Sequence, residues 1–455
     1  MTAVPFDPSV LESLRTSVRG RVVLPDDADY AAARLPWNLA VEQWPAAIVE
    51  PADAADVQAV LRIAREAGAG VTTQPNGHGA GEPLEGVVVI RPSAFDEIVV
   101  DAEARRVRVG AGVNWGRVLS ALDGTGLIAL AGSNPEVNVV ALAIGGGQSM
   151  FSRRYGLTAR SIISVDLIDA AGELRTVTDA DDPELMWGLR GGGGLFGVVT
   201  AVELALHPGE QLFGGSLMFP AEAAEAVLEA GIALARDEPE LGLDLGLMSF
   251  PDAPVLPPHL RGARLATVAL VHVGDEATGR GHAERLLAAA EPVADTLTAF
   301  TIGDLAAVAA EPVAPMAAAD FGASLDLFAD GFARDFVEAF TAGADAGLTR
   351  ASVRALGGAI AEELGADQSV VGAVTASGLL SSGVVLAGPP IDADAALAPL
   401  RELAERHGAG GAIPTFLGAG ATLADAYDRA ALDRLAAVKQ RVDPDGLIRS
   451  NRPLS

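Results

Sequence analysis

The chain has 455 residues, half of them hydrophobic, and its 60 acidic and 32 basic side chains give a net charge of −28. This length predicts roughly two to four structural units with a sizeable core. The acidic charge argues against binding to nucleic acid or to an anionic membrane, and the absence of cysteine excludes disulfides and thiolate metal sites. Neither a signal peptide nor a membrane-spanning segment is expected, and we expect a cytoplasmic protein.

Short strands and helices alternate in the first half of the chain. Apolar periodicity predicts a helix over residues 53–68, which stops at a glycine, and then a strand over residues 71–74. The same criteria predict the elements that follow: strands over 87–91 and 106–110, a helix over 115–122, a hairpin over 165–177 and a strand over 198–206.

The pattern changes near residue 212, where longer amphipathic helices begin to mix with strands. Helices are predicted over 221–235 and 282–290, and strands over 265–273 and 383–387. A helix over 422–440 and an extended segment over 447–451 close the chain. This mixture predicts an α+β fold with a second unit after residue 212.

The sequence argues against a dinucleotide-binding fold and against a metal site. Residues 192–197 fit G-x-G-x-x-G by spacing, but the segment that follows reads as a strand, whereas a dinucleotide-binding fold requires a helix there. The six histidines never pair at ligand spacing, and therefore no metal site is predicted.

Glycine is unusually abundant in four loops of the first half, over residues 77–81, 110–112, 145–147 and 191–197. Glycine lets the backbone approach a ligand closely and turn its N–H groups toward it. A single such loop is more simply explained as a turn. Four within about 120 residues favour a large cofactor that carries phosphates.

Seven segments resemble, in the same order, motifs of the FAD-linked oxidases of the vanillyl-alcohol oxidase / p-cresol methylhydroxylase (VAO/PCMH) superfamily, and most of all its berberine-bridge-enzyme-like branch. Residues 71–79 resemble the family's R-G-G-G-H-S pyrophosphate loop, and residues 443–451 its closing D-P-x-x-x-F-R-x-N motif. The other five segments are 37–51, 109–115, 132–147, 153–157 and 185–200. The resemblance runs from about residue 37 to 208 and resumes from about 414 to 455, which is about half of the chain.

The resemblance implies a bipartite FAD-binding domain of two α+β subdomains, of the PCMH type, and a substrate domain with an antiparallel sheet and helices. We expect the FAD-binding domain over residues 1–212, the substrate domain over 213–407, and a C-terminal segment, 408–455, that returns to the FAD-binding domain. By match, His78 is bonded to the flavin. Many relatives have a second, cysteinyl link, but Asn134 stands at that position, and therefore a single covalent link through His78 is expected.

The matching motifs also imply which other residues contact FAD. These are Gln74, Pro75, Asn76, Gly77, Gly79, Ala80, Gly132, Ser133, Val137, Asn138, Val139, Ala141, Gly145, Gly156, Leu157, Gly197, Val198, Val199 and Asn451. Gln74 replaces the family's arginine, which leaves fewer positive groups for the pyrophosphate. Arg160 stands where the family has an aspartate.

The catalytic base is harder to identify, because residues 413–416 lack the tyrosine that the family uses in substrate deprotonation. A hydride transfer from an alcohol needs a proton acceptor. On the strand before the family-like R-x-L-G-G-A segment, Arg354 and Ser352 are the candidates, with Asp326 a weaker one. An exposed strand face explains Arg354 and Ser352 equally well.

The resemblance implies an FAD-dependent oxidoreductase, acting as an oxidase. Such an enzyme takes a hydride from a small or secondary-metabolite-like alcohol or amine and passes the electrons to dioxygen. The alternatives are a flavin-dependent monooxygenase or oxidative cyclase, and a flavin-binding cyclase without redox turnover. The expected partners are a small-molecule substrate and dioxygen, without nucleic acid, membrane or metal, in a monomer or homodimer.

Overall fold

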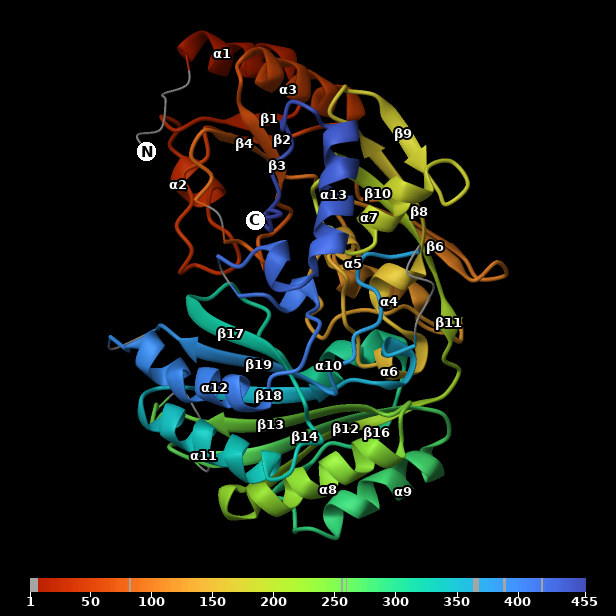
Figure 1. Ribbon diagram of the computed structural model, residues 1–455, viewed down its shortest axis with the longest axis vertical. Helices are drawn as coiled ribbons and strands as arrows, with labels where there is room; N and C mark the ends of the chain where they lie inside the picture. Colours follow the sequence, from red (N-terminus) through yellow and green to blue (C-terminus); the bar gives the residue numbers. More distant parts are fainter. Residues whose placement is uncertain are drawn as a thin grey trace.

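The computed structural model describes residues 7–81, 83–254, 257–258, 260–362, 368–387, 390–418 and 420–455. Two earlier predictions concern residues outside this range. Residues 1–6 belong to the N-terminal stretch examined for a signal peptide, and His259 is one of the six histidines. The chain forms two halves, with the first part of the chain and the C-terminal segment in one half and a large sheet in the other (Figure 1). The α+β prediction is confirmed.

The first subdomain is a four-stranded sheet in the order β1-β2-β4-β3, in which β2, β4 and β3 run parallel. Its helices begin at aspartate caps: Asp7 accepts a hydrogen bond from Ser9 N, and Asp53 accepts from Ala55 N. Apolar residues of α1 and α3 pack with the strands in one core. The elements are α1 (Pro8–Ser17), β1 (Arg21–Val23), α2 (Tyr30–Ala33), β2 (Ala47–Glu50), α3 (Ala54–Glu66), β3 (Gly70–Thr73) and β4 (Val87–Ile90).

The second subdomain is a five-stranded antiparallel sheet in the order β5-β6-β10-β8-β9. Its strands are β5 (Ile98–Asp101), β6 (Arg106–Gly110), β8 (Ile162–Ile168), β9 (Leu174–Val177) and β10 (Val198–Ala205), and β7 (Leu127–Ile128) pairs separately with β11 (His207–Pro208). Its helices are α4 (Trp115–Leu122), α5 (Val139–Ile144), α6 (Ser152–Tyr155), α7 (Pro183–Leu189) and, from the end of the chain, α13 (Arg429–Val442). One core joins these helices to the sheet.

The other half is an eight-stranded sheet in the order β15-β12-β14-β13-β18-β19-β17, with β16 also pairing to β12. Its helices α8, α9 and α11 lie on the side away from the first half (Figure 1). The strands are β12 (Leu212–Pro220), β13 (Gly242–Ser249), β14 (Arg264–Val273), β15 (Ala294–Asp295), β16 (Thr298–Phe300), β17 (Ala318–Leu325), β18 (Arg350–Ala355) and β19 (Gly378–Val385). The helices are α8 (Ala224–Asp237), α9 (Glu276–Leu287), α10 (Leu305–Ala309), α11 (Phe332–Asp345) and α12 (Ala393–His407).

The large sheet has one apolar face and one polar face. On β18 the residues Ala351, Val353 and Ala355 pack in the core with the helices, and alternation along a strand places the residues between them on the opposite face. That opposite face carries Arg350, Ser352 and Arg354, and it borders a cavity that residues of the first half also line. The large sheet begins at Leu212, while the division of the chain at residues 212/213 and 407/408 stays a prediction.

The predicted elements exist, and three of them differ most from the observed bounds. The helix predicted over 282–290 is α9, which begins at Glu276 because Asp275 accepts a hydrogen bond from Thr278 N and caps it. The helix predicted over 422–440 begins only at Arg429, after a separate 3₁₀ turn over Leu423–Asp425. The strand predicted over 383–387 is the C-terminal part of β19. None of the described helices is long and apolar enough to span a bilayer.

Candidate functional site

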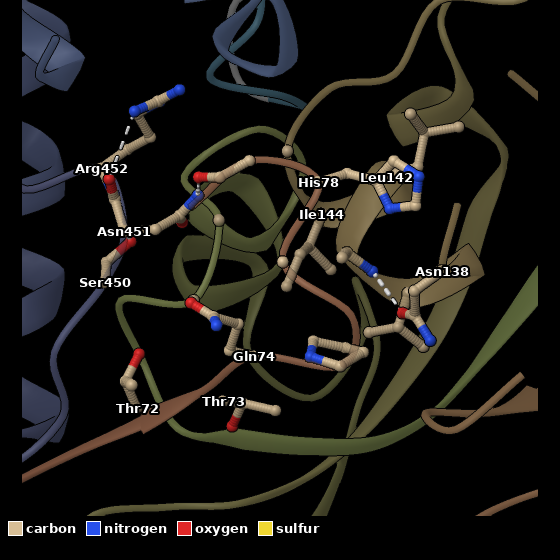
Figure 2. Close-up of a pocket in the computed structure, with 18 of the residues that line it drawn as sticks. Thr72, Thr73, Gln74, His78, Asn138, Leu142, Ile144, Ser450, Asn451 and Arg452 are labelled. Carbon is tan, nitrogen blue, oxygen red and sulfur yellow. Dashed lines mark hydrogen bonds between the residues drawn. The ribbon is translucent and has the colours of Figure 1, made fainter. Parts of the chain in front are cut away.

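A cleft of about 250 Å³ lies where the two subdomains of the first half meet the end of the chain. Figure 2 shows side chains from these distant segments around it. The cleft is lined chiefly by four segments: residues 72–80 at the end of β3 and after it, 137–145 around α5, 191–199 before and in β10, and 449–452 of the C-terminal tail. The fold thus brings together the loop that carries His78, the segment around α5 that resembles a family motif, and the tail.

The loop after β3 is held from several sides. Gln74 exchanges amide hydrogen bonds of 2.8 and 3.1 Å with Gln43. The buried guanidinium of Arg91 donates to Gln74 O at 2.7 Å and to Pro75 O at 3.1 Å. Gly77 has φ +74°, and a Cβ there would lie 2.6 Å from Pro36 Cβ, so that only glycine fits. These contacts fix the backbone that leads to His78.

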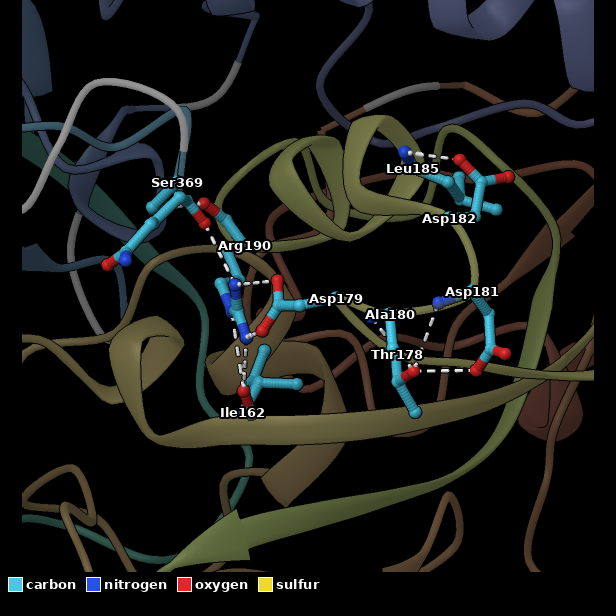
Figure 3. Close-up of polar contacts among 10 residues, drawn as sticks. Ile162, Thr178, Asp179, Ala180, Asp181, Asp182, Leu185, Arg190 and Ser369 are labelled. Carbon is cyan, nitrogen blue, oxygen red and sulfur yellow. Dashed lines mark hydrogen bonds and ion pairs between the residues drawn. The ribbon is translucent and has the colours of Figure 1, made fainter.

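The glycine-rich loop of residues 191–197 is anchored at its start by Arg190 (Figure 3). The guanidinium of Arg190 forms two 2.7 Å hydrogen bonds with the Asp179 carboxylate and one of 2.8 Å to Ile162 O. The Arg190 carbonyl accepts from Ser369 Oγ at 2.8 Å. Gly191 has φ +123°, and a Cβ there would lie 2.2 Å from a methyl group of Val371. The loop therefore presents bare backbone to the cleft.

His78 lies at the junction of this cleft with a second cavity, and it lines both. Its ring stacks on Trp37 with centroids 4.5 Å apart and 19° between the planes. Both ring nitrogens are buried and have no hydrogen-bond partner among the described residues. Burial lowers the pKa of the imidazole to about 4, against a smaller opposing effect of Glu311. The imidazole is therefore neutral at physiological pH, with a free nitrogen lone pair.

The second cavity, of about 290 Å³, lies between the first half and the polar face of the large sheet. Its charged lining side chains are Glu311, Asp320, Arg350, Arg354 and Arg452. Asp320 projects from β17 into the cavity, where the surrounding protein raises the pKa of its carboxyl group by desolvation, against the opposing charges of Arg452 and Arg350. Trp37, Phe321 and Phe416 supply aromatic surface to this cavity.

Arg354 is the centre of a buried polar network in the second cavity. Its guanidinium donates to Asp244 Oδ2 at 3.0 Å, Gln148 Oε1 at 2.9 Å and Ser133 Oγ at 2.8 Å. Glu311 Oε1 accepts from Arg354 at 3.2 Å and from Ser133 Oγ at 2.7 Å. Burial lowers the pKa of Arg354, but the carboxylates of Asp244 and Glu311 outweigh this effect and raise it. Arg354 is therefore a permanent cation that joins the large sheet to the first half.

The other catalytic candidates are placed differently. Ser352 lies on the same face of β18 but does not line either cavity. Asp326 accepts a 2.9 Å hydrogen bond from Ser377 Oγ and also lines neither of them. The hydroxyl groups of the three tyrosines all donate to carbonyls, and that of the partly buried Tyr427 donates to Gly191 O at 2.9 Å. None of them lines either cavity.

The structure brings most of the predicted cofactor residues to the first cleft. Those that line it are Gln74, Pro75, Asn76, Gly77, His78, Gly79, Ala80, Val137, Asn138, Ala141, Gly145, Gly197, Val199 and Asn451. Gly132 and Ser133 line the second cavity. Val139, Leu157 and Val198 are instead buried in hydrophobic cores, and Gly156, with φ +90°, turns the chain beside Arg160.

Sequence reasoning missed part of the site. The tail supplies Arg449 and Arg452 to the first cleft, and these cations offset the lost arginine at Gln74. Arg160, where the family has an aspartate, does not reach the cleft, because its guanidinium donates to three carbonyls between Ala359 and Gly372. Asn134, at the position of the family's cysteine, donates to Pro312 O at 2.9 Å. Glu311 and Asp320 carried no motif that could have identified them.

The residues present fit FAD. Eight glycines line the first cleft, and because they have no side chain a ligand can approach their backbone closely. Two arginines at one wall suit a pyrophosphate. The free imidazole of His78 lies where this cleft meets the second cavity. Among the described residues, no three His, Asp or Glu side chains gather as metal ligands.

Comparison with known proteins agrees with this geometry. Residues 45–178 match the family model of the FAD binding domain. The chain is 32% identical over 193 residues to (R)-6-hydroxynicotine oxidase of Paenarthrobacter nicotinovorans, an alignment that covers 42% of either chain. Its fold is similar to that of 6-hydroxy-D-nicotine oxidase of Arthrobacter nicotinovorans, with a TM-score of 0.82 and 23% identity over 96% of this chain and 98% of that one.

The fold is also similar to that of berberine bridge enzyme from Eschscholzia californica, with a TM-score of 0.77 and 15% identity over 98% of each chain. The fold and the cleft together define a protein with a bipartite FAD-binding domain and a separate sheet over its second cavity. The chain therefore carries an FAD binding domain, and its fold is that of the berberine-bridge-enzyme-like flavoproteins. The alignment with the curated relative spans less than half of that relative's length.

Proposed function

We propose that this protein is an FAD-dependent oxidoreductase that acts as an oxidase on a small-molecule alcohol or amine. The observation that carries the proposal is the position of His78, whose unpartnered imidazole lies at the junction of the two cavities. FAD would lie along the first cleft, with a single covalent link from its 8α-carbon to His78. The second cavity would hold the substrate.

When bound, FAD supplies the redox chemistry by accepting a hydride and passing two electrons to dioxygen. The chain's own residues supply position and charge. Residues 74–80, Asn138 and the tail residues Arg449 and Asn451 would hold the cofactor. Arg354 would fix the shape of the substrate cavity, and Glu311 and Asp320 are its lining carboxylates. The charged lining favours a substrate that carries hydrogen-bonding groups.

The test is to denature the purified protein with acid and to inspect the pellet. A yellow pellet and a fluorescent band on a denaturing gel are expected, and the band should disappear in His78→Ala while FAD remains bound without a link. His207→Ala is the matched control, because His207 stacks on Tyr155 and lines neither cavity. A colourless protein that takes up no added FAD would contradict the proposal.

The reaction class is tested by screening alcohols and amines in aerated buffer. An oxidase forms one hydrogen peroxide for each dioxygen consumed. Consumption of dioxygen with an oxygen atom in the product and little peroxide would instead show a monooxygenase. Flavin that stays oxidised but is required for product formation would show a cyclase without redox turnover.

A further inference from the structure

The indole ring of Trp37 stacks on the ring of His78. The two rings are nearly parallel, with centroids 4.5 Å apart. Because neither ring nitrogen of His78 has a hydrogen-bond partner among the described residues, no hydrogen bond sets the plane of the imidazole. The stack on the indole is therefore the contact that orients it.

The segment that carries Trp37 is pressed onto the loop that carries His78. The backbone N–H of Trp37 donates to Asn76 O at 2.8 Å. At Gly77 any Cβ would lie 2.6 Å from Pro36 Cβ. The two segments, residues 36–37 and residues 76–78, are therefore in direct contact. A shift of one segment would displace the other.

The large-sheet half holds Trp37 from its other side. The indole Nε1 of Trp37 donates to Val313 O at 3.2 Å, and Trp37 O accepts from Met316 N at 3.2 Å. Asn38 pairs with Ala318, since its side-chain amide donates to Ala318 O at 3.0 Å and accepts from Ala318 N at 3.2 Å. Residues 313–318 therefore form a strap, which joins the large sheet to Trp37.

We propose that Trp37 is a positioning residue for attachment of the cofactor: it presents the His78 imidazole to the flavin, and the strap of residues 313–318 holds it there. The proposal rests on the proposed function. In the step concerned, an imidazole nitrogen bonds to the 8α-carbon of FAD. One C–H bond and the imidazole N–H bond break, two protons leave, and the two electrons pass to dioxygen, which becomes hydrogen peroxide.

The electrostatic setting supports this role, because only the neutral imidazole has a lone pair to bond. The low pKa of His78, about 4, has burial as its main cause, and the indole face provides part of that burial. Glu311, from the loop after α10, acts in the opposite direction. The other charged groups around the shared cavity are Asp320 of β17, Arg350 and Arg354 of β18, and Arg452 of the tail.

The test follows formation of the covalent link directly, without a substrate. The full-length chain, produced flavin-free under riboflavin limitation, is mixed with FAD in air, and the fluorescent band on a denaturing gel is followed with time. Total bound flavin is measured in parallel by absorbance. The variants are Trp37→Ala, Trp37→Phe and, as the matched control, Trp44→Ala, since Trp44 is 47% exposed and lines neither cavity.

We expect Trp37→Ala to bind FAD but to form the link about tenfold more slowly or worse, because misplacement of a reacting group by about 1 Å commonly costs about a hundredfold. Trp37→Phe keeps an aromatic face and should stay within about threefold of the wild type. Trp44→Ala should match the wild type. Linking of Trp37→Ala at the wild-type rate would overturn the proposal. If that variant is not recovered folded, Trp37→Leu is judged by the same criterion.

The pH dependence separates positioning from a general loss of stability. In the wild type the linking rate should fall only as the pH drops through about 4. In Trp37→Ala water reaches the ring, and this acid limb should move up toward the ordinary histidine pKa of about 6.5. An unmoved limb would contradict the role. A wild-type protein that binds no FAD, or binds it without a link, would instead show that the proposed function fails at His78.

Discussion

At the scale of single residues, the buried imidazole of His78 makes the stability of the flavin-free protein depend on pH. Its pKa is about 4 in the folded chain and about 6.5 in the unfolded chain. Below pH 6.5 the unfolded chain therefore binds a proton that the folded chain does not. The contribution is fully present above pH 6.5 and is lost as the pH falls toward 4. Between pH 7 and pH 5 the loss is about 2 kcal/mol.

The measurement is urea unfolding of the flavin-free protein at pH 7 and pH 5, for the wild type and for His78→Gln. The wild type should lose about 2 kcal/mol more of its unfolding free energy than the variant over this interval. Titration of the other histidines and of the carboxyl groups is common to both proteins and cancels in the difference. Equal losses in the two proteins would mean that the ring of His78 is hydrated in the folded state.

Some residues of the site could be predicted from the sequence, and others could not. Loop residues such as Gly77 and His78 stand next to one another in a motif, and a motif can be read locally. Glu311 and Asp320 lie in the large-sheet half, where no motif marks them, and they reach the site only because the large sheet lies over the first half. Such residues could not be found, since their role depends on packing between distant segments.

At the scale of elements, Arg153 on α6 joins the two halves by capping the end of α8. Its guanidinium, in a residue only 3% exposed, donates to Ala235 O, Glu238 O and Leu241 O at 2.5 to 2.9 Å. It also reaches Leu356 O at 3.2 Å. A cation suits the negative end of a helix dipole. Arg153 thereby satisfies carbonyl groups that the last turn of α8 leaves unpaired.

Replacing Arg153 with methionine should therefore lower the free energy of unfolding by about 3 kcal/mol or more, because several buried carbonyls lose their donor. The control is Arg154→Met. The neighbouring Arg154 side chain is 35% exposed, pairs with Glu240 at 3.3 Å and donates to a single carbonyl, Val273 O, at 2.9 Å. A surface ion pair of this kind contributes about 1 kcal/mol or less. Urea unfolding of the FAD-loaded proteins measures both. Equal effects would show that the α8 carbonyls find water in place of Arg153.

Elements were predictable from the sequence where the pattern is local. The helix α4 and the strand β6 have the predicted bounds, because apolar residues recur at a clear period over their whole length. The predicted start of α9 was wrong for a physical reason. Its first turns, Glu276 to Gly281, carry two glycines and little apolar surface, and therefore show no helical periodicity. The cap at Asp275 fixes this start, and a cap is a weaker signal than periodicity.

At the scale of the whole molecule, the end of the chain closes the first cleft. The tail pairs with β3, since Val71 N donates to Leu447 O at 2.8 Å and Arg449 N donates to Val71 O at 2.7 Å. Its residues 449–452 then line the cleft. The α+β class followed from the mixture of predicted helices and strands, and the return of the tail followed from the resemblance. The sequence did not predict that the tail pairs with β3, because nothing in an extended segment specifies which strand it joins.

Lys439, the only lysine of the chain, ties this tail to the glycine-rich loop. Its ammonium group donates to Leu195 O at 2.7 Å and Ile448 O at 2.8 Å, and it pairs with Asp443. Burial lowers its pKa, against the effect of Asp443. Since these bonds must break before the amine can react, modification of Lys439 reports on opening of the tail.

We therefore expect an N-hydroxysuccinimide ester to modify Lys439 of the FAD-loaded protein about a hundredfold more slowly than in the urea-unfolded chain. Removal of FAD should raise the rate in the folded protein about tenfold or more, because a ligand that contacts the tail stabilises its closed position. Mass spectrometry of the peptide that contains residue 439 gives both rates. The urea-unfolded chain, with and without FAD, is the control and should show no difference. If FAD leaves the folded rate unchanged, the tail does not open with the cleft, and bound FAD is held by the glycine-rich loops and His78 alone.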